Sequence, residues 1–139
     1  MLPEFQREMR ELKALGVPII LHSCGDVNMY LPDLVEAGID GLNPLQRTAN
    51  MDLKRVKDAF GDRISLVGNI NASETLPYGS PADVEREVVE ALRVAAPAGG
   101  YVMATDHSLH CGIPVSNVMA LVKATRRHGV YAGNNLPIN

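Results

Sequence analysis

Apolar residues follow two different spacings along the chain, and the two spacings alternate. Spacings of three and four residues are typical of helices, whereas short apolar runs rich in β-branched residues are typical of buried strands. The first spacing predicts helices over residues 3–15, 30–37, 52–60, 81–94 and 116–128. The second predicts strands over residues 17–22, 64–71 and 101–105, with a further brief strand within residues 38–46.

Polar residues and glycines mark several boundaries of these elements. Ser80 can cap the helix that begins at Pro81, and Ser116 can cap the last helix, which Gly129 ends. The polar residues between the third strand and the helix that begins at Pro81 predict a loop over residues 71–80. The elements thus follow one another with short connections.

The predicted order is one helix followed by four strand–helix units. Such alternation indicates an α/β fold with a parallel sheet and helices outside it, as in barrels and doubly wound sheets. Ligands bind at the carboxyl ends of the strands in both architectures, so we expect a functional site at that edge. Polar side chains follow all four strands there: His22 and Cys24; Asn43 and Gln46; Asn69 and Asn71; His107, His110 and Cys111.

The pair His22 and Cys24 offers the most specific chemistry. In extended backbone, residues two apart point to the same side, so the imidazole and the thiol can converge from one strand end. Zinc favours nitrogen and thiolate sulfur, and three protein ligands leave a fourth position open for substrate. The alternative is a satisfied core histidine beside an inert buried cysteine. His107 and Cys111, after the last strand, are the further candidate ligands.

Composition narrows the possible partners. The 139 residues are 46% hydrophobic and 21% charged with a net charge of −3, which argues against nucleic acid or an anionic membrane as the main partner. No apolar run reaches the roughly 20 residues of a membrane span, and we expect a cytoplasmic protein. In that compartment, Cys24 and Cys111 are expected to serve metal binding or catalysis rather than a disulfide.

Several segments together resemble a known superfamily. They are His22 to Asp26, Glu36 to Asp40 continuing through Asn43 to Gln46, Gly68 to Ile70, Gly99 to Tyr101, Asp106 with His107, and Pro114 to Asn117. They look like the C-terminal half of the uroporphyrinogen decarboxylase superfamily. That superfamily includes the uroporphyrinogen decarboxylases of haem synthesis and the zinc-dependent methyltransferases that move a methyl group from a corrinoid protein to coenzyme M.

The resemblance implies a TIM (β/α)₈ barrel of which this chain holds about four βα units, a half-barrel corresponding to the fifth to eighth units. Residues 1–131 then form the C-terminal half of the barrel, and residues 132–139 form a tail. The superfamily's N-terminal half is missing from the resemblance, and four units leave two sheet edges unpaired. We therefore expect either a missing N-terminal half or self-association.

The resemblance also implies roles for individual residues. A His-x-Cys followed by a later Cys is the zinc signature of the methyltransferase branch, which His22, Cys24 and Cys111 match. Counted without a gap from Asn117, the last ligand falls instead on His107, where the decarboxylases carry a catalytic histidine. Both positions stay candidates. Substrate binding is expected of Asn43, Gln46 and Asn69, at the same sheet edge.

Three functions are compatible with these residues. In the first, zinc activates a small-molecule thiol that takes a methyl group from a methylcorrinoid carried on a partner protein. In the second, the chain contributes to decarboxylation of uroporphyrinogen, a tetrapyrrole, without metal and with His107 placing a carboxylate. In the third, it is a non-catalytic half-barrel that self-associates.

Overall fold

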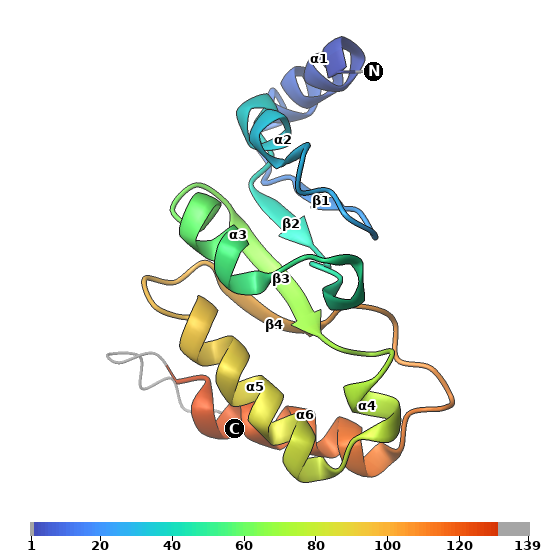
Figure 1. Ribbon diagram of the computed structural model, residues 1–139. Helices are drawn as coiled ribbons and strands as arrows, with labels where there is room; N and C mark the ends of the chain where they lie inside the picture. Colours follow the sequence, from blue (N-terminus) through green and yellow to red (C-terminus); the bar gives the residue numbers. More distant parts are fainter. Residues whose placement is uncertain (1, 131–139) are drawn as a thin grey trace.

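The computed structural model describes residues 2–130, which form a four-stranded parallel sheet with helices packed along it (Figure 1). The strands lie in sequence order: β1 (Ile20–His22), β2 (Gly41–Asn43), β3 (Ser65–Ile70) and β4 (Tyr101–Thr105). The helices are α1 (Leu2–Lys13), α2 (Leu31–Ala37), α3 (Leu53–Phe60), α4 (Thr75–Tyr78), α5 (Pro81–Ala95) and α6 (Val115–His128), with a 3₁₀ turn η1 (Arg47–Ala49) after β2. This arrangement confirms the predicted α/β half-barrel.

The two faces of the sheet differ in their covering. Leu42 and Leu66 are register partners whose side chains are 1% and 0% exposed, because α3 and α5 cover that face. On the opposite face, Ile20 and Val102 are 58% and 52% exposed. In a closed barrel that second face would line the interior, so it is the face that a complete barrel would bury.

Helix boundaries follow from local hydrogen bonds, as the sequence predicted at Ser80. Its hydroxyl accepts from the N–H of Asp83, and the Asp83 carboxylate accepts from the N–H of Ser80, which is a capping box at the start of α5. The Ser80 hydroxyl also donates to that carboxylate at 2.6 Å, and this bond, followed by those from the Ser80 N–H and Arg86, lowers the pKa of Asp83 to about 2. Asp52 caps α3 in the same way by accepting from Arg55 N at 2.7 Å.

Three local predictions were wrong. Residues 17–19 are not part of β1, since the Ile19 N–H donates to the Asp40 carboxylate at 2.7 Å instead of to a strand. The expected loop 71–80 contains α4, a helix too short to show periodicity. Ser116 lies inside α6 and does not cap it, because the carbonyl of Pro114 accepts the first N–H groups of that helix.

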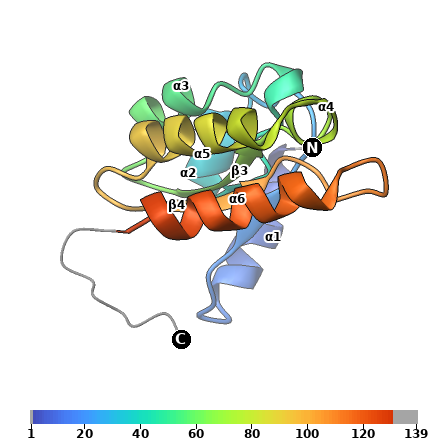
Figure 2. The same ribbon diagram turned by 90° about the horizontal axis from the view of Figure 1, so that it is seen from below.

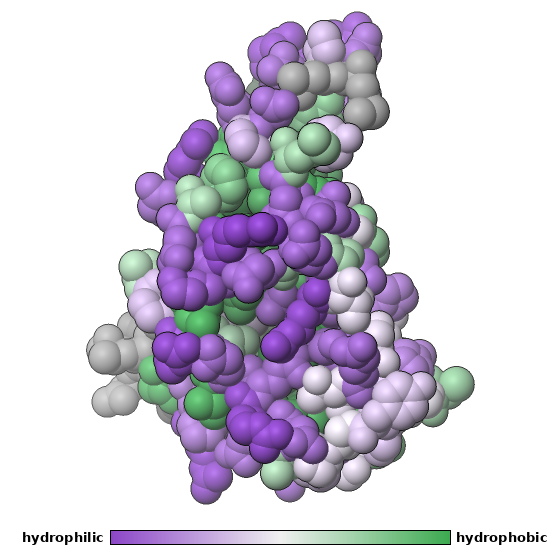
Figure 3. Space-filling view, in the orientation of Figure 1, coloured by the Kyte–Doolittle hydropathy of each residue, from purple (hydrophilic) through white to green (hydrophobic). Residues whose placement is uncertain are grey.

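The helices at the two ends of the sheet are packed unequally. Seen from below, α5 and α6 run side by side under β3 and β4 (Figure 2). At the other end α1 packs on α2 through buried Met9, but Leu12 and Leu15 are 40% and 69% exposed. The surface over α3 and α5 is mostly hydrophilic (Figure 3). Exposed apolar side chains therefore lie at the β1 end and on the open sheet face, and also along α6 at Val115, Met119 and Val122.

Two further sequence predictions concern membrane-spanning segments and the division between the half-barrel and the tail. No helix within residues 2–130 is long and apolar enough to cross a bilayer. The predicted tail, residues 132–139, lies outside the described residues, so the division at residue 131 stays a prediction.

Candidate functional site

His22 and Cys24 converge at the carboxyl end of β1, as their spacing predicted. The His22 Nε2 atom lies 3.4 Å from Cys24 Sγ, and both side chains are exposed. The other ring nitrogen, Nδ1, lies 2.6 Å from Oδ1 of Asn43. This imidazole is thus held between a thiol and an amide and is not packed into the core of the described chain.

The backbone of β1 and β2 places these side chains. His22 and Asn43 are register partners, and the N–H of Ser23 donates to the Asn43 carbonyl at 2.8 Å. The next residue, Pro44, presses against Gly68 of β3 so closely that a Cβ on Gly68 would lie 2.0 Å from the Pro44 carbonyl oxygen. Asn43 is therefore fixed between its two neighbouring strands.

The separation of the two donor atoms fits a shared zinc ion. With Zn–N near 2.0–2.1 Å and Zn–S near 2.3 Å, two tetrahedral ligands lie about 3.5 Å apart, close to the spacing of Nε2 and Sγ. Within residues 2–130, however, no three His, Cys, Asp or Glu side chains come close enough together to hold a metal ion. The structure thus assembles two of the expected ligands and not the third.

The two candidates for the third ligand lie on the loop after β4. His107 and Cys111 are both exposed, and Cys111 is a free thiol. Between them, His110 holds the loop: its Nδ1 accepts from Gly112 N at 3.2 Å, which leaves Nε2 to donate to the Ala72 carbonyl at 3.3 Å. The choice between His107 and Cys111 stays open.

Gln46 organises the loop that carries Cys24. Its Oε1 accepts from the N–H of Gly25 at 2.9 Å, and its amide nitrogen contacts the Thr48 hydroxyl at 3.3 Å. Gly25 has a φ of +91°, which favours glycine there. Gln46 thereby ties the His22–Asp26 loop to the segment after β2.

A second tie joins the same two segments through Asp26. Its carboxylate accepts from the backbone and side-chain amides of Asn28 and, at 3.1 Å, from the side chain of Asn50. These bonds, the Asn28 N–H first, lower the pKa of Asp26 below its ordinary value. The carboxylate therefore stays ionised near neutral pH and can hold the loop.

Asn69 is buried, with 6% of its surface exposed. Its amide nitrogen donates to the carbonyls of Leu45 and Met51 at 2.8 and 3.0 Å, so it supports the segment after β2. The substrate-binding role expected of Asn43, Gln46 and Asn69 stays a prediction, but the amide of each already has partners within the protein.

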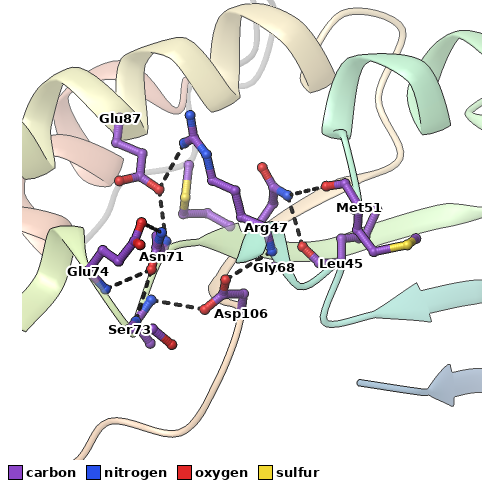
Figure 4. Close-up of polar contacts among 12 residues, drawn as sticks. Leu45, Arg47, Met51, Gly68, Asn71, Ser73, Glu74, Glu87 and Asp106 are labelled. Carbon is purple, nitrogen blue, oxygen red and sulfur yellow. Dashed lines mark hydrogen bonds and ion pairs between the residues drawn. The ribbon is translucent and has the colours of Figure 1, made fainter. Parts of the chain in front are cut away.

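The sequence analysis gave no role to Asp106, which is fully buried at the end of β4. Its two carboxylate oxygens accept from Ala72 N at 2.9 Å and from Arg47 N at 3.1 Å (Figure 4). One carboxylate thus joins the segments that follow β2, β3 and β4. The signal available in the sequence was an acidic residue directly after an apolar strand with no turn residue between them.

Glu87 is a second buried acid that the sequence analysis missed. Only 7% of its side chain is exposed; it accepts from Asn71 N at 2.8 Å and pairs with the Arg47 guanidinium at 3.2 Å (Figure 4). Its position on α5, three residues after buried Val84, puts a charge on the apolar face of the helix. A charge on that face predicts a buried partner.

Known proteins resemble this chain along nearly its whole length. The sequence model of the family described as "Uroporphyrinogen decarboxylase (URO-D)" matches residues 1–128. A uroporphyrinogen decarboxylase of Alkalilimnicola ehrlichii is 31% identical over 118 residues, which are 85% of this chain and 31% of that protein. The methylcobamide:CoM methyltransferase MtaA of Methanosarcina barkeri is 35% identical over 105 residues, covering 76% of this chain and 29% of that protein.

A solved structure agrees with these relatives. A methyltransferase from Methanosarcina mazei superposes with a TM-score of 0.74 at 28% identity, covering 94% of this chain and 36% of its own. The chain therefore spans about a third of the length of the proteins it matches. By its sequence match and its fold, this chain belongs to the uroporphyrinogen decarboxylase family.

Proposed function

We propose that this chain forms the zinc-binding part of an enzyme that transfers a methyl group from a methylcorrinoid to a small thiol. The observation that carries the proposal is the exposed pair of His22 Nε2 and Cys24 Sγ, 3.4 Å apart at the carboxyl edge of the sheet. Relatives of this family include a methylcobamide:CoM methyltransferase, whose name describes the same class of reaction.

In this proposal, His22 Nε2 and Cys24 Sγ hold the zinc, and His107 or Cys111 completes the set. Bound zinc lowers the pKa of a coordinated thiol, so the thiol is present as a thiolate at neutral pH. A zinc ion held by these residues would supply the thiol sulfur as the nucleophile that accepts the methyl group in the transfer step. Gln46 and Asp26 keep the Cys24 loop in place for this step.

The proposed enzyme needs more than this chain. The open sheet face bears the exposed side chains of Ile20 and Val102, and β1 and β4 each pair with one neighbour in the described sheet. Burial of that face requires either the N-terminal half of a barrel or a second copy of the chain. The corrinoid would be carried on a separate partner protein.

Decarboxylation of uroporphyrinogen is the second candidate. It is supported by the exposed position of His107 after β4 and by relatives such as the decarboxylase of Alkalilimnicola ehrlichii. This reaction needs no thiol and no metal, so it does not explain why His22 and Cys24 lie together. It predicts tetrapyrrole binding that is unchanged in Cys24→Ala.

Elemental analysis of protein purified without chelator separates these functions. About one zinc per chain, lost in Cys24→Ala and in only one of His107→Ala and Cys111→Ala, supports the proposal and identifies the third ligand. A stable zinc-free protein, even after reconstitution, contradicts it. Incubation with methylcobalamin and a thiol, and separately with uroporphyrinogen, then assigns the activity.

Light scattering after size exclusion tests the third function, a non-catalytic half-barrel. A stable dimer that binds neither zinc nor tetrapyrrole would support the self-associating half-barrel and contradict the proposed enzyme. A monomer would count against that self-association.

A further inference from the structure

We infer that Asn43 is a positioning residue that sets the tautomer of His22, so that Nε2 faces Cys24 with a free lone pair. This inference rests on the proposed zinc site, because it concerns how one of its ligands is prepared. It gives Asn43 a different role from the substrate contact that its place in the sequence suggested.

The orientation of the Asn43 amide follows from its two neighbours. On one side lies the Val67 carbonyl, 3.5 Å from Nδ2, and a carbonyl can only accept. The nitrogen end of the amide therefore faces Val67, and the oxygen end faces His22 Nδ1 at 2.6 Å. The reverse orientation would set two acceptors against each other at Val67.

The protonation of the imidazole then follows. An amide oxygen has no hydrogen to donate, so the bond at 2.6 Å requires the proton on His22 Nδ1. In the neutral ring Nε2 is left with its lone pair, and this is the atom 3.4 Å from Cys24 Sγ. Histidines that bind metals commonly donate their other N–H to a carbonyl or carboxylate in this way.

Asn43 is well placed for such a role because its backbone is held on both sides. Its carbonyl accepts from Ser23 N at 2.8 Å, and the Pro44 carbonyl that follows accepts from Asn69 N at 2.9 Å. Since Pro44 is in tight contact with Gly68, the backbone of Asn43 cannot shift without disturbing β3, and the bonds to Val67 and His22 hold its amide. The imidazole is therefore oriented before any ligand arrives.

The first test reads the tautomer directly in metal-free protein. Long-range ¹H–¹⁵N NMR at a pH where the ring is neutral, with His22→Ala to assign the signal, is expected to show the Nδ1–H form in the wild type. In Asn43→Leu the Nε2–H form should become substantial, and Asn43→Asp should restore the Nδ1–H form. A wild-type spectrum dominated by Nε2–H overturns the inference, whatever the variants do.

The second test measures zinc affinity by competition with a chromophoric chelator. We expect a loss of about 10- to 100-fold in Asn43→Leu and near wild-type affinity in Asn43→Asp. Equal affinity in all three proteins, with an unchanged tautomer, refutes the role of Asn43 while leaving the zinc site standing. Absence of zinc binding in every protein, with the expected tautomers, refutes the zinc site and leaves the role of Asn43 in orienting His22.

Discussion

The two ends of the carboxyl edge of the sheet use polar side chains in opposite ways. At the β1–β2 end, His22 and Cys24 are exposed and contact each other through side-chain atoms. At the β3–β4 end, Asn69 and Asp106 are buried and bond to backbone groups of neighbouring loops. His22 and Cys24 thus have donor atoms available to a ligand, whereas Asn69 and Asp106 hold the loops of the sheet edge in place.

This difference shows that position at a strand end does not by itself identify a site residue. Burial and the choice of partner separate the two kinds. A buried polar group that is satisfied by backbone N–H or C=O groups stabilises the fold, because losing it would leave those groups unpaired. An exposed imidazole 3.4 Å from a thiol adds little stability but retains its chemistry.

The stability of the protein should be most sensitive to substitution at the contact between Pro44 and Gly68, which joins the two ends of the edge. Gly68→Ala adds a Cβ 2.0 Å from the Pro44 carbonyl oxygen at a φ of +115°, so we expect a loss of about 4 kcal/mol or more in unfolding free energy. Gly99→Ala is the control, since its φ is also positive but nothing lies within 4 Å of the added atom. Denaturant unfolding of both variants measures the difference, and equal losses would contradict the close approach.

Asp106→Ala should have the next largest effect. Removal of the carboxylate leaves the buried N–H of Ala72 and the partly buried N–H of Arg47 without this partner, which costs roughly 3 kcal/mol. The exposed Asp62→Ala should change the stability by less than about 0.5 kcal/mol. Urea unfolding of the two variants decides, and a similar small change in both would show that the carboxylate does not hold the loops.

Cys24→Ala should barely change stability in metal-free protein. The thiol is exposed and its hydrogen-bond partner is the His22 ring, so we expect a change below about 0.5 kcal/mol. In the presence of zinc, the wild type should gain stability that the variant does not. Thermal unfolding with and without zinc checks this, and an equal zinc-dependent gain in both proteins would remove Cys24 from the site.

The smallest effect should be the pH dependence from Asp26. Its pKa in the folded protein lies below the ordinary 3.8, chiefly because of the Asn28 N–H. Its contribution to stability is therefore present above the pKa of the unfolded chain and is lost as the pH falls through the lower folded value. The unfolding free energies of Asp26→Asn and of the wild type should therefore become more similar as the pH falls below about 4. A difference that stays constant with pH would argue against these hydrogen bonds.

The sequence predicted the order of elements and the convergence of His22 with Cys24, because apolar spacing and the alternation of a strand are local properties. It missed α4, which is too short for a periodic pattern, and it assigned the cap of α6 to Ser116 instead of Pro114. The first error arises from a helix too short to repeat a spacing, and the second arises where local hydrogen bonds decide a helix boundary.

The roles of Asp106 and Glu87 were beyond the reach of local patterns. Asp106 bonds to Arg47, 59 positions away in the sequence, and such a partner is known only once the strands are placed side by side. The same holds for Asn43, whose oxygen could equally have faced a substrate until the register of β1 with β2 set it against His22. Long-range pairing therefore decides which polar residues bind ligands and which support the fold.

X-ray absorption at the zinc edge tests the central claim most directly, since it reports the ligand atoms themselves. The account predicts nitrogen at about 2.0–2.1 Å and sulfur at about 2.3 Å, with the sulfur signal reduced or lost in Cys24→Ala. One protein sulfur indicates His107 as the third ligand, and two indicate Cys111. A zinc shell without sulfur, or one unchanged in Cys24→Ala, would contradict the site built on His22 and Cys24.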